Sequence, residues 1–146
     1  SEQACKANID YLIANPEVGI LGPTGHIVPM DAYAGSNMAR VAQLAARTGV
    51  DSDTVKNLNF VAGSMFLARN KAFIPLLNIA LSETDFEAEA NQLDGTLAHT
   101  LERMFPVSAF SIGLTTRSPD NSVTENYTYT TKSEKMIQGS DLAGNK

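Results

Sequence analysis

The chain lacks the features of a disulfide-stabilised or membrane-spanning protein. Its 146 residues include one cysteine, Cys5, so no internal disulfide can form and a reducing compartment is expected. The longest apolar runs, such as residues 74–77, fall far short of the roughly 20 residues that a membrane span needs. The start of the chain has neither the basic region nor the apolar region of a signal peptide. We therefore expect a cytoplasmic protein without a transmembrane segment.

Basic charge is also scarce. The chain has 11 Lys and Arg against 16 Asp and Glu, a net charge of −5. Residues 83–103 hold six acidic side chains and one arginine, which accounts for the whole excess. Because a nucleic-acid-binding protein normally presents a basic face, we predict no nucleic-acid partner.

The pattern of apolar residues predicts one domain over residues 1–116 and a polar tail over 117–146. Helices are predicted over 2–14, from Ser36 or Asn37 to Gly49, over 71–80, and over 94–105 with Pro106 as its stop. Strands are predicted over 18–21, 59–68, 107–114 and, in the tail, 123–130, with the last ten residues disordered. This alternation predicts an α/β fold, a layered mixed sheet flanked by helices. So few short strands indicate a fragment of a larger sheet.

An acidic stretch over 82–92 leads into the strongest helical pattern, and Glu89 and Asp94 lie at this junction. Asp94, followed by Gly95 and Thr96, is predicted to open the helix, where free N–H groups stabilise a charged carboxylate. A carboxylate held in this way suits a general base that takes a proton from a sugar hydroxyl. The alternative is that Asp94 caps the helix and does nothing more.

His99 and Arg103 lie four residues apart on the same predicted helix, so they could present two donors to a phosphate or a carboxylate. The alternative is a set of hydrogen bonds on the helix surface. No second His or Cys stands at ligand spacing, so we predict no metal site here. Asp51 and Asp53 have the Asp-x-Asp spelling of some cation sites, but their position predicts a cap for the following turn.

Gly22, Gly25 and His26 follow the strand at 18–21, where α/β folds place binding loops. The alternative is a turn that requires glycine. Gly63 lies inside the predicted strand over 59–68, and a glycine there often marks a close approach of the backbone.

Four blocks of the sequence carry a further signal: residues 18–26, 60–66, 85–87 and 92–103. The most specific are GSMF at 63–66 and DGTLAHTLER at 94–103. In order and spacing, over about residues 5–113, they resemble the rhamnan synthesis protein F family of bacterial glycosyltransferases.

The resemblance implies the acceptor-side half of a GT-A glycosyltransferase. Such an enzyme would transfer a rhamnose-like sugar, with inversion, from a nucleotide diphosphate donor such as dTDP-rhamnose to a growing cell-surface polysaccharide or lipopolysaccharide O-antigen. The resemblance leaves open whether this reaction uses a divalent cation. By analogy Asp94 is the base, with Glu89 second. The implied substrate-binding residues are Gly22, Gly25, His26, Gly63, Ser64, His99 and Arg103.

The chain also departs from this family. The family's N-terminal half, with its nucleotide-binding strands, is absent from these 146 residues. Position 67 is Leu, where members of the family often have an aromatic residue. The polar tail has no counterpart in the family. We therefore expect the fragment alone to be inactive, and any association with the inner face of the membrane to come from the absent half. The alternative function is a non-catalytic carbohydrate-binding or scaffolding module.

Overall fold

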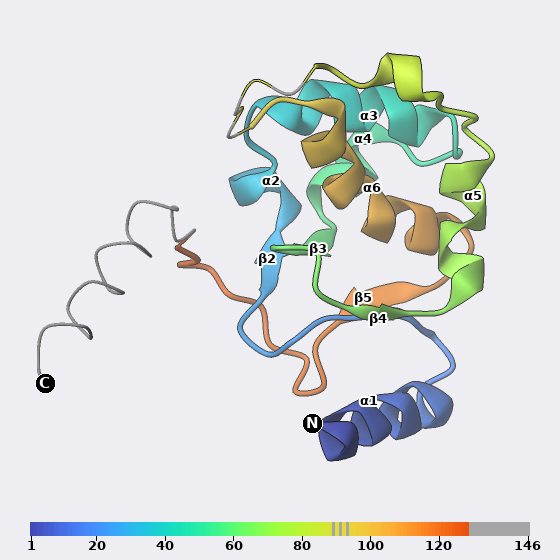
Figure 1. Cartoon of the computed structure of the whole chain (residues 1–146), viewed down its shortest axis with the longest axis vertical. Coiled ribbons are helices and arrows are strands. Elements are labelled where there is room, and N and C mark those ends of the chain that lie inside the picture. The colour runs from blue at the N-terminus through green and yellow to red at the C-terminus, as the bar shows by residue number, and fades with distance from the viewer. Residues whose placement is uncertain (89, 91, 93, 129–146) are drawn as a thin grey trace, which may run out of the picture.

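The computed structural model describes residues 1–88, 90, 92 and 94–128 and has a mixed α/β fold (Figure 1). Strand β1 (Val18–Leu21) is the middle of a three-stranded sheet, between an antiparallel β4 (Leu67–Ala68) and a parallel β5 (Thr115–Arg117). Strands β2 (Ile27–Pro29) and β3 (Asn59–Val61) form a separate antiparallel pair. The prediction of an α/β fold with helices around mixed strands is confirmed, whereas the GT-A assignment stays a prediction.

Helices surround both sheets. They are α1 (Glu2–Ala14), α2 (Met30–Tyr33), α3 (Met38–Ala46), α4 (Ser52–Lys56), α5 (Ile74–Leu77) and α6 (Leu97–Ser111), with 3-10 turns at Gly35–Asn37, Asn70–Phe73 and Glu83–Asp85. Helix α6 packs against α3, α5 and β3 and passes through the middle of the molecule (Figure 1). All four residues of β1 are buried, as expected for a central strand.

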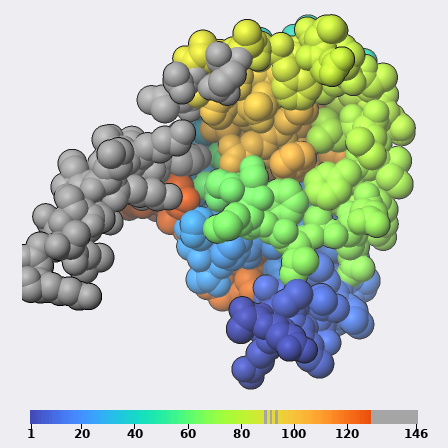
Figure 2. Space-filling view, viewed as in Figure 1, coloured from blue at the N-terminus to red at the C-terminus, as the bar shows by residue number. Residues whose placement is uncertain are grey.

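Helix α1 begins and ends where the sequence predicts, with Ser1 as its N-cap and Pro16 just beyond its end. It nevertheless buries no residue, and the side chains of Ile9 and Ile13 are exposed. Arg69 connects it to the sheet, because its guanidinium donates to the carbonyl oxygens of Leu12, Asn15 and Val18. Figure 1 shows α1 below the rest of the molecule, and Figure 2 shows its atoms packed against that lower face.

The predicted end of the last helix at Pro106 is wrong, and so is the strand predicted over 107–114. Helix α6 continues through Pro106 to Ser111, and β5 begins only at Thr115. A proline inside a helix removes one hydrogen bond and costs about 3 kcal/mol. Burial of the second half of the helix offsets this cost, since Met104 and Val107 are fully buried. Ser108 Oγ also donates to the carbonyl of Ala72, at 2.6 Å.

The strand predicted over 59–68 is two short strands in different sheets. Gly63 and Ser64 both have positive φ, +84° and +54°, and their turn separates β3 from β4. The predicted close approach at Gly63 is wrong, because a Cβ there would meet no atom within 4 Å. The left-handed backbone, not crowding, is what favours glycine at this position.

Other predicted boundaries shift in smaller ways. The helix expected over 71–80 is the 3-10 turn followed by α5, with Pro75 in the first turn as predicted. Residues 123–128 form no strand. The N–H of Thr124 donates to the carbonyl of Ile27 in β2, but Tyr33 Oη binds the next backbone groups, since it donates to the carbonyl of Glu125 and accepts from the N–H of Tyr127. The last ten residues, which the sequence predicts to be disordered, lie outside the described residues, as do residues 129 and 130 of the predicted strand.

The turn at Gly63 gives a test at one position. We expect Gly63→Val to lower the free energy of unfolding by about 1–2 kcal/mol or more, because a β-branched residue is strained at positive φ. Gly63→Asn should unfold closer to wild type, since asparagine tolerates this conformation. Thermal unfolding followed by circular dichroism measures both. Equal losses for Asn and Val would contradict the conformational explanation and indicate crowding instead.

Candidate functional site

The predicted binding loops lie together at the carboxyl ends of two strands. The loop at 22–26 follows β1, and the turn at Gly63 and Ser64 follows β3. The N–H of Ala62 donates to the carbonyl of His26 at 2.9 Å, so the two segments are in contact. The first half of α6 then approaches this edge from another part of the chain (Figure 1).

Glu102 connects α6 to the turn after β3. Its Oε1 accepts from the N–H of Gly63 at 2.8 Å and from Ser64 Oγ at 3.1 Å. Its Oε2 accepts from Arg103 Nη1 at 2.7 Å, and its side chain is 15% exposed. The sequence prediction did not include Glu102 among the site residues. No local pattern signals this role, because both contacts with the turn span more than 35 residues.

Arg103 is buried, and its Nη1 and Nη2 groups donate inside the protein, whereas its Nε has no hydrogen-bond partner within the described residues. Its Nη1 also donates to the carbonyl of His99 at 2.9 Å, and its Nη2 donates to the carbonyl of Tyr33 at 3.3 Å. The guanidinium carbon lies 5.0 Å from the centre of the Phe60 ring, within the range of a cation–π contact. Only 6% of the side chain is exposed. Arg103 therefore organises the residues around it, and little of its surface is open to a ligand.

Asp94 connects the segment before α6 to the start of α3. Its Oδ2 accepts from the N–H of Ser36 at 3.2 Å and from Ser36 Oγ at 3.0 Å, and its Oδ1 accepts from Asn37 Nδ2. A Cβ on Gly35 would lie 2.6 Å from Oδ2, so glycine leaves room for the carboxylate. Oδ1 also lies 4.0 Å from Arg103 Nη2, and 40% of the Asp94 side chain is exposed.

These contacts keep Asp94 ionised. Partial desolvation acts to raise its pKa, but hydrogen bonds from Asn37, from the N–H of Gly95 and from Ser36 outweigh this effect. The pKa of Asp94 is therefore lowered from its ordinary value. The carboxylate is a fixed negative charge with one side open to solvent.

Asp94 is not the residue that caps α6, contrary to the prediction. The helix begins at Leu97 with Thr96 as its N-cap, and Thr96 Oγ1 accepts from the N–H of His99 at 3.4 Å. Glu87 Oε2 accepts from the N–H of Leu97 at 2.8 Å, although Glu87 lies ten residues earlier. Because Thr96 and Glu87 bind the free N–H groups, Asp94 is available to bind Ser36.

The two histidines lie in different surroundings. Nδ1 of His99 lies 2.6 Å from Thr96 Oγ1, at the start of α6. Nδ1 of His26 lies 3.1 Å from Tyr127 Oη, and the two rings meet edge to face with centres 5.5 Å apart. Tyr127 also packs edge to face on Tyr33, at 6.4 Å. Sequence reasoning missed both tyrosines, because it placed Tyr127 in a strand and gave Tyr33 no role.

The two glycines of the first loop have structural explanations. A Cβ on Gly22 would lie 2.8 Å from side-chain carbons of both Ile27 and Val61, so this position is packed. Gly25 has a φ of +82° and open space around it, as in a turn. The prediction that both glycines bind substrate stays untested.

A chain of contacts around the first half of α6 links six of the predicted residues. Glu102 accepts from Gly63 and Ser64. Arg103 binds the carbonyls of His99 and Tyr33 and lies 4.0 Å from Asp94, and Tyr33 packs on Tyr127, which contacts His26. Glu89, the second predicted catalytic residue, lies outside the described residues. Asp51 caps α4 as predicted, since its Oδ1 accepts from the N–H groups of Asp53 and Thr54.

The described residues contain neither a metal-binding cluster nor a membrane-spanning helix. Among residues 1–88, 90, 92 and 94–128, no group of three or more His, Cys, Asp or Glu side chains is arranged to hold a metal ion. Over the same residues, no helix has the length and apolar character to cross a membrane.

Comparison with known proteins gives two related sequences. Both bear the name Uncharacterized protein WxcX and come from strains of Xanthomonas campestris pv. campestris, one of them B100. They are 40% and 39% identical to this chain over 101 residues, which is 69% of the chain. The chain spans about 14% of the length of these relatives. No family model matches the chain, and no solved structure matches it.

The ionisation of Glu87 makes the stability of the protein depend on pH. The N–H of Leu97 and the guanidinium of Arg40 lower the pKa of Glu87 from 4.5 to about 2. Because the folded state has the lower pKa, the contribution of Glu87 to stability is present above pH 4.5 and is lost as the pH falls toward 2. We therefore expect Glu87→Gln to lower the Tm at pH 7 and to differ little from wild type near pH 2.

Thermal unfolding at pH 7, 4.5, 3 and 2 tests this expectation. Glu83→Gln is the matched control, because Glu83 is an exposed carboxylate in the same acidic stretch and forms no side-chain hydrogen bond within the described part of the chain. The control should follow wild type at every pH. A difference between Glu87→Gln and wild type that stays constant down to pH 2 would contradict the role given to the Glu87 carboxylate.

Proposed function

We propose that residues 1–146 form the acceptor-side part of a bacterial glycosyltransferase, as their resemblance to the rhamnan synthesis protein F family implies. The observation that best supports this is that hydrogen bonds link all four resembling blocks. Glu87 in the block at 85–87 accepts from the N–H of Leu97 in the block at 92–103, at 2.8 Å. Ala62 donates to the carbonyl of His26 at 2.9 Å, and Gly63 donates to Glu102 at 2.8 Å. These two contacts lie at the carboxyl ends of β1 and β3, where α/β proteins bind ligands.

In this proposal Asp94 accepts the proton of the acceptor. The acceptor hydroxyl oxygen attacks the anomeric carbon of the donor sugar and gives its proton to the carboxylate. The bond to the nucleotide diphosphate breaks, the electron pair leaves with the diphosphate, and the configuration at the anomeric carbon inverts. Two properties suit Asp94 to this step: its lowered pKa keeps it ionised, and 40% of its side chain is exposed.

The donor belongs to another part of the protein in this proposal. The resemblance implies a deoxythymidine diphosphate-linked rhamnose or a similar activated sugar, bound by the half of the family that carries the nucleotide-binding strands. A divalent cation that assists the diphosphate would belong to that half as well. The acceptor saccharide would lie against His26, Ser64 and His99. Such an enzyme would work in the cytoplasm, at the inner face of the membrane.

A second function is favoured by one specific observation. Both oxygens of Asp94 already accept hydrogen bonds, from Ser36 and from Asn37. A carboxylate bound in this way is a weaker base than a free one, because each donor stabilises its charged form. The same surroundings would suit a module that binds a saccharide without transferring a sugar.

Substitution of Asp94 separates the two functions. In the intact protein we expect Asp94→Asn to lower sugar transfer about 10²–10⁴-fold, the usual contribution of a general base, with acceptor binding changed only a few-fold. Transfer is measured with a radiolabelled nucleotide sugar and an isolated saccharide acceptor, and binding by calorimetry.

Ser36→Ala is the matched control, because it removes one hydrogen bond to Asp94 and keeps the carboxylate. Ser36→Ala should retain most of the transfer activity. Any loss of transfer in this variant measures how much of the loss in Asp94→Asn comes from the missing hydrogen bond and not from the missing carboxylate. Transfer that is unchanged in Asp94→Asn would remove Asp94 as the base. A wild-type protein that binds the acceptor but transfers nothing would support the binding module instead.

A further inference from the structure

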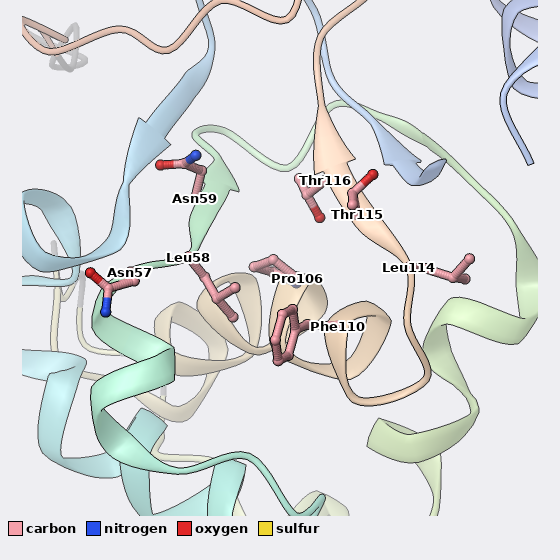
Figure 3. Close-up of a pocket in the computed structure, with 8 residues that line it drawn as sticks. All are labelled: Asn57, Leu58, Asn59, Pro106, Phe110, Leu114, Thr115 and Thr116. Carbon is pink, nitrogen blue, oxygen red and sulfur yellow. The ribbon is translucent and has the colours of Figure 1, made fainter. Parts of the chain in front are cut away.

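The cavity beside the second half of α6 holds none of the groups of the candidate site. It measures about 220 Å³ and lies between the helix and the facing edges of β3 and β5, near the starts of these strands (Figure 3). Among the described residues that line it, none is charged and none is a predicted site residue. Asp94 and its partners lie elsewhere, where the segment before α6 meets the 3-10 turn at Gly35–Asn37.

Asn37, the last residue of this turn, is a fully buried polar residue. Only 1% of its surface is exposed. A buried side-chain amide needs hydrogen-bond partners, because leaving it unpaired costs free energy. Asn37 occupies the N-cap position of α3, yet its side chain makes no capping bond to residues 38–46. Its partners lie outside α3, so capping does not explain why an amide is buried here.

The contacts of Asn37 determine which way its amide points. Nδ2 donates to the carbonyl of Ala34 at 3.1 Å and to Asp94 Oδ1. Oδ1 of Asn37 lies 3.3 Å from the hydroxyl oxygen of Thr100, a donor that is fully buried on α6. A flipped amide would direct its own oxygen at two oxygens that cannot donate a hydrogen bond. The NH₂ group of Asn37 therefore faces Asp94.

The same turn holds the other oxygen of Asp94. Oδ2 accepts from the N–H and the hydroxyl of Ser36, at 3.2 and 3.0 Å. Gly35 has a φ of +59°, and a Cβ built on it would lie 2.6 Å from Oδ2. A side chain at position 35 would thus displace the carboxylate. Arg103 Nη2, a charged group that faces Oδ1, lies 4.0 Å away and attracts the carboxylate without a short hydrogen bond.

We propose that Asn37 is a positioning residue for Asp94, and that Gly35 leaves the space in which the carboxylate is held. This inference rests on the proposed function, in which Asp94 takes the proton of the acceptor. The turn binds both carboxylate oxygens, so the base keeps one orientation before the acceptor arrives. Such fixation matters for a reaction, because a misplacement of about 1 Å can lower the rate about 10²-fold.

Carbon-13 NMR of the aspartate carboxyl groups tests the contact in the 146-residue chain, without any transfer reaction. Asn37→Leu keeps the approximate volume of the side chain and removes the donor. We expect the pKa of Asp94 to rise toward or above the ordinary value of an aspartate, because a hydrogen bond to its charged form is lost. An unchanged titration of Asp94 in a folded Asn37→Leu protein would overturn the proposal.

Asn57→Leu is the matched control for this titration. Asn57 Nδ2 donates to the carbonyl of Asp53 at 2.8 Å, so the variant also loses an amide hydrogen bond, but one that does not involve Asp94. Figure 3 shows Asn57 on the wall of the cavity, at the end of α4. The control should leave the titration of Asp94 as in wild type.

A double-mutant cycle on Gly35 and Asp94 keeps the proposal testable if Asn37→Leu does not fold. Alanine at position 35 is strained by the positive φ in any background, but its Cβ meets the carboxylate only when Asp94 is present. We expect Gly35→Ala to lower the Tm of wild type by about 2–4 °C more than it lowers the Tm of Asp94→Ala. Equal losses in the two backgrounds would contradict the proposal, since the carboxylate would not occupy the space beside Gly35.

Kinetics of the intact protein separate positioning from a merely structural role. Asn37→Leu should lower kcat for transfer about 10–10²-fold and change the KM for the acceptor only a few-fold. The acid limb of the pH profile should move to higher pH, in the same direction as the pKa of Asp94. A merely structural loss would reduce the amount of folded enzyme and lower the rate at every pH without moving this limb.

The outcomes also distinguish this proposal from the proposed transfer function. Unchanged transfer in Asp94→Asn would remove the proposed base, and with it the catalytic role of Asn37, even where the NMR titration confirms their contact. Loss of transfer in Asp94→Asn with normal kinetics in Asn37→Leu would keep the proposed function and overturn the positioning role of Asn37.

Discussion

Burial of the Arg103 guanidinium is the constraint on which the arrangement of the candidate site depends. A charge removed from water must find partners, and Arg103 finds the carboxylate of Glu102, two backbone carbonyls and the ring of Phe60. Each of these contacts also fixes a neighbouring segment. Glu102 fixes the turn after β3 through Gly63. The carbonyl of Tyr33 is bound by Arg103, and the Tyr33 side chain fixes the segment that places Tyr127 beside His26.

The length of α6 determines how the two ends of the molecule are related. Because the helix continues through Pro106, one rigid element carries Glu102 and Arg103 in its first part and Phe110 near its end. The first part faces the carboxyl ends of β1 and β3, and Pro106 and Phe110 line the cavity between β3 and β5. A helix that ended at Pro106 would have carried only the first of these features.

The sequence predicted those parts of the fold that local patterns determine. Helix α1, strand β1, the start of α3 and the cap at Asp51 lie where expected, because capping residues, glycine turns and continuous apolar runs act over a few residues. The errors lie where distant contacts decide. Packing of Val107 and hydrogen bonding of Ser108 keep α6 helical past Pro106.

In the candidate site, too, local patterns predicted some features and distant contacts determined the others. His99 and Arg103 were predicted from their spacing on one helix, and that helix exists. The burial of Arg103 was not predictable, because its partners Tyr33 and Phe60 lie more than 40 residues away in the sequence. Asp94 was expected to cap the helix, whereas the structure gives that role to Thr96 and Glu87. No pattern within the acidic stretch distinguishes these three residues.

The most direct test of this account is a double-mutant cycle on Glu102 and Arg103, with the free energy of unfolding measured in urea. Arg103→Met should destabilise the protein by about 3–5 kcal/mol, because it leaves the carboxylate of Glu102 without its charged partner. Glu102→Gln combined with Arg103→Met should cost less than the sum of the single changes by about 1 kcal/mol or more. Losses that add to within about 0.5 kcal/mol would contradict the claim that this ion pair organises the site.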